Sequence, residues 1–145
     1  MDIQNMMDEI TSQNFRIEYL YGLWAKMHGM SYHTLMVLYV LQEHQPCTQK
    51  EITQHWLLTK QTVNTVIKDL EAKGYVELVA GRNQKEKLVK VTSSGQVYMD
   101  SVLTATAELE YRILGRLGEE EARRIADSLR HIADLFQEEV DSYAK

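Results

Sequence analysis

Residues 48–92 constrain the fold of this chain more than any other stretch. They open with Thr48-Gln49-Lys50-Glu51, where the threonine oxygen can accept the third backbone N–H and the glutamate can bond back. This capping box predicts a short helix of about two turns. The spacing of apolar residues places Ile52 and Trp56 on the buried side of that helix.

A second helix is expected from Lys60 to Lys73, with Thr59 as its N-cap. Gly74 follows as a residue that can take the left-handed conformation in which helices often end. The apolar face of this helix carries Val63, Val66, Ile67 and Leu70. Its polar face carries Lys60, Gln61, Thr62, Asn64, Thr65 and Lys68.

Two short apolar runs after Gly74 predict a β-hairpin. The expected strands are Tyr75–Val79 and Lys87–Val91, and the polar, basic tip between them is 80–86. A helix, a tight turn, a second helix and a basic hairpin follow one another in the order of a winged helix-turn-helix. The fold class is therefore mainly α with a small β-hairpin wing.

The polar face of the second helix favours nucleic acid as its partner. Its Lys, Gln, Thr and Asn side chains can donate to phosphates or read base edges. Acidic residues come only late in this helix, at Asp69 and Glu71. Two alternatives stay open: an ordinary polar surface, and a winged helix that contacts proteins without binding DNA.

The net charge of −5 does not oppose this interpretation, because charge is segregated along the chain. Residues 47–92 hold eight Lys and Arg against five acids, a balance of +3, and the remainder carries −8. The positive part coincides with the helix-turn-helix and its wing.

At this point the sequence resembles a known family. The stretch 59–76 resembles the recognition helix and first wing strand of MarR-type transcriptional regulators. Residues 48–52 look like the start of their preceding helix, and 88–95 are similar to the segment that leads into their long dimerisation helix. One departure is at the wing tip, where the family usually holds an Asp and an Arg two residues apart and this chain has Asn83 and Lys85.

The resemblance implies binding to double-stranded DNA through the recognition helix in the major groove and the wing in the minor groove. Arg82 or Lys85 is then the minor-groove probe. The candidate DNA-binding residues are Thr48, Gln49, Thr59, Lys60, Gln61, Thr62, Asn64, Thr65, Lys68, Arg82, Lys85 and Lys87. Repression is the more common mode of action in the family.

The flanking segments predict long amphipathic helices. They are expected at Met1–Met27, at Tyr32–Glu43, at Ser93–Arg116 and from Glu119 onward. The last one carries a near-heptad stripe with small residues: Ala122, Ile125, Ala126, Leu129, Ile132, Ala133, Phe136, Val140 and Tyr143. It reads as half of a homodimer interface, shared with the first helix, or alternatively as the coiled-coil tether of a larger protein.

The domain prediction follows from these helices. Residues 1–30 and 95–145 form a helical dimerisation region, and residues 31–94 form the winged DNA-binding domain. A dimer would present two recognition helices to a pseudo-palindromic operator.

The resemblance also implies a small aromatic or phenolic effector, bound between the dimerisation helices and the winged unit. Candidate residues at that junction are Trp24, His28, Tyr32, Met36 and Tyr39. The alternative for each is a plain core or surface aromatic or Met.

The single cysteine, Cys47, allows two interpretations. A thiol just ahead of a helix N-terminus can have a lowered pKa, which would suit a thiol-based redox sensor. The competing interpretation is a buried structural cysteine.

Other classes of function find little support. The five histidines show no paired spacing, so no metal site and no cofactor are expected. No phosphate loop, GxSxG or HExxH motif is present, so no enzyme activity is expected. No apolar run approaches the ~20 residues of a membrane span, and a cytoplasmic protein is expected.

Overall fold

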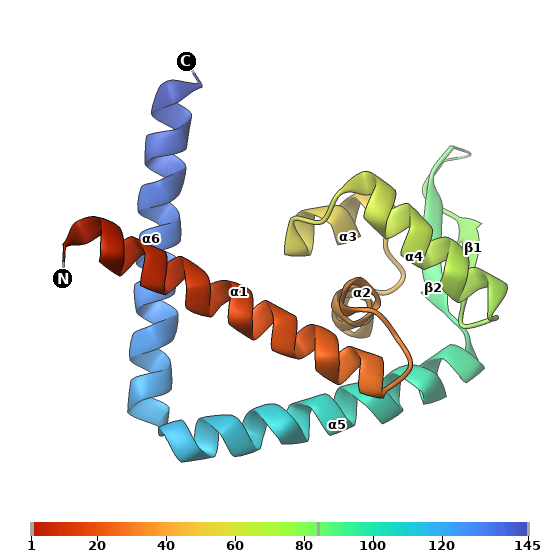
Figure 1. Cartoon of the computed structure of the whole chain (residues 1–145). Helices are drawn as coiled ribbons and strands as arrows, with labels where there is room; N and C mark the ends of the chain where they lie inside the picture. The colour runs from red at the N-terminus through yellow and green to blue at the C-terminus, as the bar shows by residue number, and fades with distance from the viewer. Residues whose placement is uncertain (1, 84, 145) are drawn as a thin grey trace. The chain divides into compact units, whose positions relative to one another are not determined.

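The computed structural model describes residues 2–83 and 85–144. The elements in chain order are α1 (Ile3–Met27), α2 (Tyr32–His44), α3 (Gln49–Trp56), α4 (Lys60–Ala72), β1 (Val76–Ala80), β2 (Lys87–Val91), α5 (Ser93–Leu117) and α6 (Glu119–Tyr143) (Figure 1). The predicted class, mainly α with a β-hairpin wing, is confirmed. Three residues named in the predicted ranges, Met1, Gln84 and Lys145, lie outside the described residues.

The chain divides into two compact units, Met1–Leu103 and Thr104–Lys145, with the boundary inside α5. The first unit contains α1 to α4, the hairpin and the first turns of α5. All of the buried hydrophobic residues among those described lie in this unit, between Ala25 and Leu103. Its core gathers the middle of α2, one face of α4, both strands and the start of α5.

The recognition-type helix α4 forms because its two ends are closed by local hydrogen bonds. Thr59 accepts from the Thr62 N–H at the N-terminus. At the other end the Gly74 N–H donates to the Glu71 carbonyl and the Tyr75 N–H donates to the Leu70 carbonyl, which is a Schellman motif with Gly74 at φ +76°. The predicted apolar face is confirmed, since Val63, Val66, Ile67 and Leu70 are buried.

The same motif explains why the first strand starts one residue later than predicted. Tyr75 is occupied by the end of α4, so pairing begins at Val76, which lies opposite Val91. The register ends with Ala80 opposite Lys87. Cys47 adds a bridge on the other side of β2, where Cys47 and Val89 exchange both backbone hydrogen bonds, at 3.2 and 2.7 Å.

The start of α5 is held against the end of α4 by a close backbone approach. A Cβ on Gly95 would lie 1.9 Å from the Tyr75 carbonyl oxygen, so only glycine fits. The Thr92 and Ser94 hydroxyls both donate to the Gly74 carbonyl, at 2.6 and 3.1 Å. These contacts, which we call the Gly74 clamp, tie the C-terminus of α4 to the N-terminus of α5.

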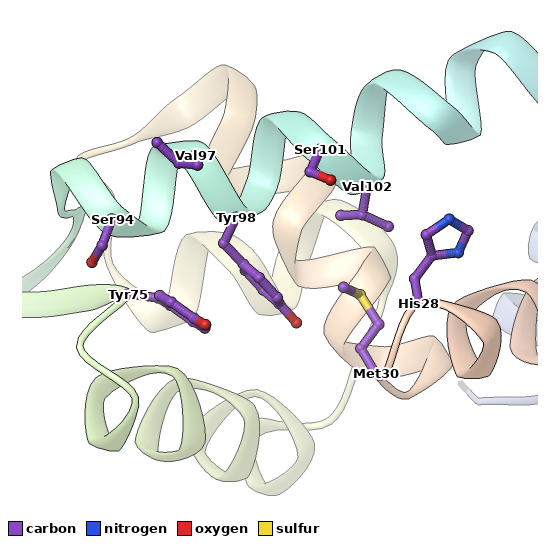
Figure 2. A pocket seen from close by; sticks show the side chains of 8 residues that line it. All are labelled: His28, Met30, Tyr75, Ser94, Val97, Tyr98, Ser101 and Val102. Atoms are coloured by element: carbon purple, nitrogen blue, oxygen red, sulfur yellow. The ribbon is translucent and has the colours of Figure 1, made fainter.

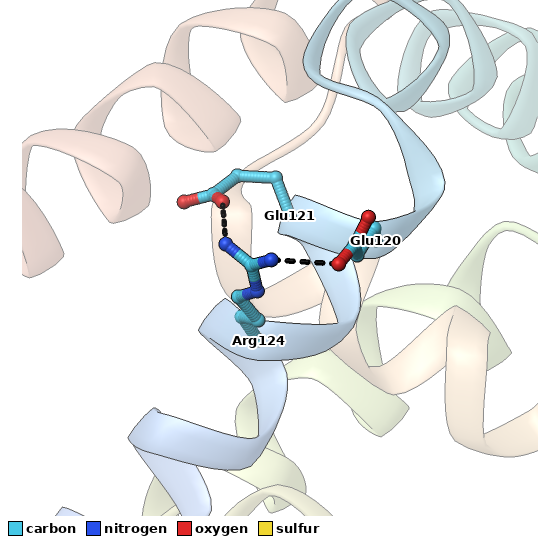
Figure 3. A network of polar contacts seen from close by, with 3 residues as sticks. All are labelled: Glu120, Glu121 and Arg124. Carbon is cyan, nitrogen blue, oxygen red and sulfur yellow. Dashed lines mark hydrogen bonds and ion pairs between the residues drawn. The ribbon is translucent and has the colours of Figure 1, made fainter.

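The second unit contains α6, none of whose described residues is buried. Its first turn carries three glutamates, as expected at a positive helix end, and Glu120 and Glu121 both contact Arg124 (Figure 3). These pairs are exposed and contribute little stability. Across the described residues, the helices are too short or too polar to span a membrane.

Candidate nucleic-acid interface

The outer face of α4 is polar and exposed to solvent. Lys60, Gln61, Thr65 and Lys68 are exposed on it, opposite the buried apolar face. The first acid on this helix is Asp69, whose carboxylate pairs with Lys73 at 3.0 Å. The N-terminal two turns therefore carry positive charge and hydrogen-bond donors without a neighbouring carboxylate on the same helix.

Thr59 and Thr62 have a structural task before any contact with a ligand. The Thr59 hydroxyl donates to the Thr62 hydroxyl at 2.8 Å and accepts from the Thr62 N–H at 3.1 Å. Thr62 keeps the donor capacity of its own hydroxyl. Thr59 serves first as the cap that positions the helix.

Asn64 and Gln49 connect the two helices of the helix-turn-helix. The Asn64 amide donates to the Gln49 side-chain oxygen at 3.3 Å. This bond joins the start of α3 to the middle of α4 and orients both amides. The side-chain oxygen of Asn64 and the amide NH₂ of Gln49 keep capacity for a further partner.

The start of α3 confirms the predicted capping box, because Thr48 accepts from the Glu51 N–H and Glu51 accepts from the Thr48 N–H. The end of α3 corrects a prediction. Trp56 was expected on the buried side with Ile52, but it is 51% exposed, and its ring lies beside the Tyr39 ring with centroids 6.4 Å apart. Leu57 takes the left-handed conformation that ends α3 where the sequence predicted, so Trp56 lies in the last turn of the helix, where its side chain is left half exposed.

The tip of the wing is ordered by Asn83, at the position where the resemblance implied an Asp. Its side-chain oxygen accepts the N–H groups of Lys85 and Glu86, at 3.0 and 2.9 Å. The Glu86 carboxylate in turn accepts the Arg82 N–H at 2.7 Å. Arg82, Lys85 and Lys87 are left exposed around this turn. An amide thus supplies the acceptor that the turn requires.

Cys47 contradicts the expectation of a lowered pKa. The side chain is 2% exposed, and burial, with a smaller contribution from the Glu51 carboxylate, raises the pKa of the thiol to about 11. Both effects disfavour the thiolate, desolvation because it removes water from the charge and Glu51 because it repels it. A protonated, buried thiol is a poor redox sensor, so the structural interpretation of Cys47 is favoured.

A pocket of about 370 Å³ lies beside the Gly74 clamp, within the first unit. The α1–α2 turn contributes His28 and Met30, the end of α4 contributes Tyr75, and α5 contributes a stripe (Figure 2). The stripe is Ser94, Val97, Tyr98, Ser101 and Val102. The rings of Tyr75 and Tyr98 stack with centroids 4.2 Å apart and planes 10° apart.

The predicted effector residues are only partly brought together. His28 lines the pocket, and the Trp24 ring packs against it at 4.5 Å. Tyr32 contacts His33 instead, and burial raises the pKa of its hydroxyl. Met36 is part of the core, and Tyr39 faces Trp56. Sequence reasoning missed the stripe on α5, although its spacing of three and four residues marks one helix face.

The comparisons with known proteins agree with this geometry. The sequence pattern that describes the MarR family matches residues 28–85, from the α1–α2 turn through the helix-turn-helix to the wing tip. The HTH-type transcriptional regulator YwoH of Bacillus subtilis is 29% identical over 100 residues, which cover 69% of this chain and 70% of YwoH. Over residues 28–85 the chain is therefore similar to the MarR family.

Solved MarR-type structures show the same fold over nearly the whole chain. The MarR family regulator NMB1585 of Neisseria meningitidis superposes with a TM-score of 0.84 at 24% identity, covering 98% of this chain and 99% of the other. Staphylococcus aureus MepR, solved as a DNA complex, superposes with a TM-score of 0.73 at 18% identity, covering 94% of this chain and 98% of the other. Staphylococcus aureus MarR in complex with salicylate and kanamycin superposes with a TM-score of 0.75 at 16% identity, covering 94% of this chain and 93% of the other.

Proposed function

We propose that this chain is a homodimeric MarR-type repressor that binds a pseudo-palindromic operator and releases it in response to a small molecule. In this proposal residues 31–94 bind DNA, and residues 1–30 and 95–145 form the dimer. The N-terminal half of α4 enters the major groove, and Arg82 or Lys85 at the wing tip reaches the minor groove.

The observation that carries the proposal is the outer face of α4. It presents lysine, glutamine and threonine side chains with no acid before Asp69, on a helix whose opposite face is fully anchored in the core. An anchored helix of this kind presents its side chains in one orientation, which base readout requires. The DNA complex of MepR, which shares the fold, is consistent with this use.

A dimer is supported by apolar faces that the chain leaves exposed. On α1 these are Ile3, Met6, Ile10 and Ile17, and on α6 they are Ile125, Leu129, Phe136 and Val140. Rows of exposed apolar side chains along a helix indicate a partner surface. A dimer also suits the DNA, because single modules bury only about 600–1,000 Å² and two half-sites lie about 34 Å apart.

The effector part of the proposal is supported by the pocket and its neighbours. Tyr75 and Ser94 belong to the pocket lining and also to the segments that the Gly74 clamp joins. A ligand seated there would bias the position of α4 relative to α5 and so shift the population of DNA-competent dimers. The S. aureus MarR of the same fold was solved in complex with salicylate, a small aromatic molecule, which supports this part of the proposal.

Selection of bound fragments from random DNA tests the DNA-binding claim. We expect a recovered palindrome whose half-sites are one helical turn apart, and an affinity that falls steeply with salt. If the winged helix only contacts proteins, no palindrome is enriched and no salt-dependent affinity is measured. Replacing Arg82 or Lys85 by alanine should weaken binding to all DNA sequences alike. Each change should also lower the slope of log affinity against log salt concentration by about 1. Lys90→Ala is the matched control, because Lys90 is exposed on β2 opposite Glu77, away from the tip.

A further inference from the structure

The pocket beside the Gly74 clamp is aromatic and polar but uncharged. Its described lining contains two tyrosines, two serines, a methionine, two valines and a histidine, with no Lys, Arg, Asp or Glu. The volume of about 370 Å³ lies in the range of small-molecule sites. The stacked pair Tyr75 and Tyr98 forms one wall, as Figure 2 shows.

A cation beside the tyrosine pair, Lys73, is already paired with a carboxylate. Lys73 lies close enough to interact with the Tyr75 and Tyr98 hydroxyls, but its ammonium is paired with Asp69 at 3.0 Å. The hydrogen bond from Lys73 to Asp69 raises the pKa of the lysine, and burial raises the pKa of Tyr98. Burial thus favours the neutral form of Tyr98, and the Lys73 ammonium already has a carboxylate partner.

The hydrogen-bonding groups of the pocket favour a ligand that donates. The His28 Nδ1 lies 2.9 Å from the Trp24 carbonyl, which can only accept, so the proton is on Nδ1. In the neutral ring, Nε2 is then an acceptor. The Ser94 hydroxyl proton is used on the Gly74 carbonyl, which leaves its oxygen to accept. Ser101 adds an exposed hydroxyl on the same helix face.

From these features we propose that the effector of this regulator is a neutral, planar aromatic molecule with a hydrogen-bond donor, and that the pocket discriminates against aromatic carboxylates. The proposal rests on the proposed function and narrows its ligand class. A flat ring fits against the tyrosine wall and Met30. A carboxylate would lose hydration without meeting a Lys or Arg side chain among the described lining residues, which disfavours its binding.

Salicylamide and salicylate form a matched pair for the test, since they share a ring and a phenol and differ in charge. Each is titrated into the full-length protein at neutral pH, with affinity measured by calorimetry and location by the NMR signal of the Met30 methyl group. We expect salicylamide to bind at least tenfold more tightly than salicylate and to shift the Met30 signal. Equal or tighter binding of salicylate would overturn the proposal, as would the absence of salicylamide binding at millimolar concentration.

Two variants of Ser101 sharpen the result. Ser101→Lys places a cation in the lining and should reverse the preference toward salicylate, whereas Ser101→Gln adds similar bulk without charge and should keep it. If both variants behave alike, charge does not set the selectivity and the proposal fails. DNA binding without ligand is measured in parallel. If the wild-type protein does not bind DNA, the proposed function is refuted. If it binds DNA normally but prefers salicylate to salicylamide, only this inference is refuted.

Discussion

Helices α4 and α6 have the same kind of apolar periodicity, but the apolar face of α4 is buried within the chain and that of α6 is not. On α4 the four apolar residues at positions 63, 66, 67 and 70 are at most 6% exposed. On α6 the residues Ile125, Leu129, Phe136 and Val140 are between 41% and 55% exposed. The winged unit thus buries the apolar face of α4 within the same chain, whereas α6 presents an apolar stripe that the chain does not cover. An apolar pattern predicts that a helix face will be buried, but it does not predict by which chain.

The largest expected effect concerns the uncovered stripe. Replacing Leu129 and Phe136 together by aspartate should abolish the dimer at micromolar concentration, because two charges would then be desolvated at the interface. Sedimentation velocity measures the change from dimer to monomer. Gln137→Asp adds charge to the same helix beside the stripe and should leave the dimer intact. A dimer that survives the double variant would show that α6 is not part of the interface.

Within the winged unit, the Gly74 clamp should be the most sensitive point. Gly95→Ala forces a Cβ to 1.9 Å from the Tyr75 carbonyl, so we expect a loss of about 3 kcal/mol or more in the free energy of unfolding. Gly115→Ala is the control on the same helix, since a Cβ there meets nothing within 4 Å and should stabilise by about 0.5–1 kcal/mol. Urea denaturation followed by circular dichroism compares the two. Equal effects would mean that the approach of α5 to Tyr75 is not tight.

Burial of the Cys47 thiol should make the stability of the same core depend on pH. Because burial raises the pKa of the thiol to about 11 from an unfolded value near 9.0, the folded state holds its proton where the unfolded state has lost it. The free energy of unfolding should therefore fall by about 1–3 kcal/mol between pH 9 and 11 and be unaffected by this thiol below pH 8. Denaturation curves of the wild type and Cys47→Ala, measured across this window, isolate the contribution. Fast alkylation of the folded protein by iodoacetamide at pH 7 would contradict it.

The polar face of α4 should affect specificity more than stability. Asn64→Ala removes an amide that Gln49 orients, and should reduce discrimination between operator and random DNA by about 1–3 kcal/mol. Thr62→Ala should act in the same direction. Competition binding with operator and random duplexes gives the ratio, and thermal melting checks the fold. Unchanged specificity in both variants would move the base-reading surface elsewhere.

The smallest effect is expected at the turn between α3 and α4. Leu57 has φ 53° and ψ 37° with 90% of its side chain exposed, so it holds an unfavourable backbone conformation without packing in return. Leu57→Gly should raise the free energy of unfolding by up to about 1 kcal/mol. Leu58→Gly, at a residue that packs against the core, should lower it. A loss of stability in Leu57→Gly would reveal a contact of this side chain that the folded chain alone does not explain.

Local signals in the sequence predicted most of the winged unit. The capping box at Thr48, the N-cap at Thr59 and the left-handed Gly74 depend on neighbouring residues only, and all three are confirmed. The first strand was shifted by one residue because Tyr75 closes the Schellman motif. Trp56 was misplaced because helical periodicity puts it on the same face as Ile52 but does not show whether neighbouring elements cover that face at the end of the helix.

The sequence alone therefore determined the order of elements, the two faces of α4 and the segregation of charge, because each follows from interactions within a few residues of the chain. Only the tertiary structure decided that the backbone of Cys47 is hydrogen-bonded to that of Val89 and that the Gly74 clamp joins α4 to α5. It also decided that a stripe on α5 lines a pocket together with Tyr75 and the α1–α2 turn. These contacts link residues far apart in the chain. Desolvation and close packing at such contacts depend on which surfaces meet, and no local pattern specifies that.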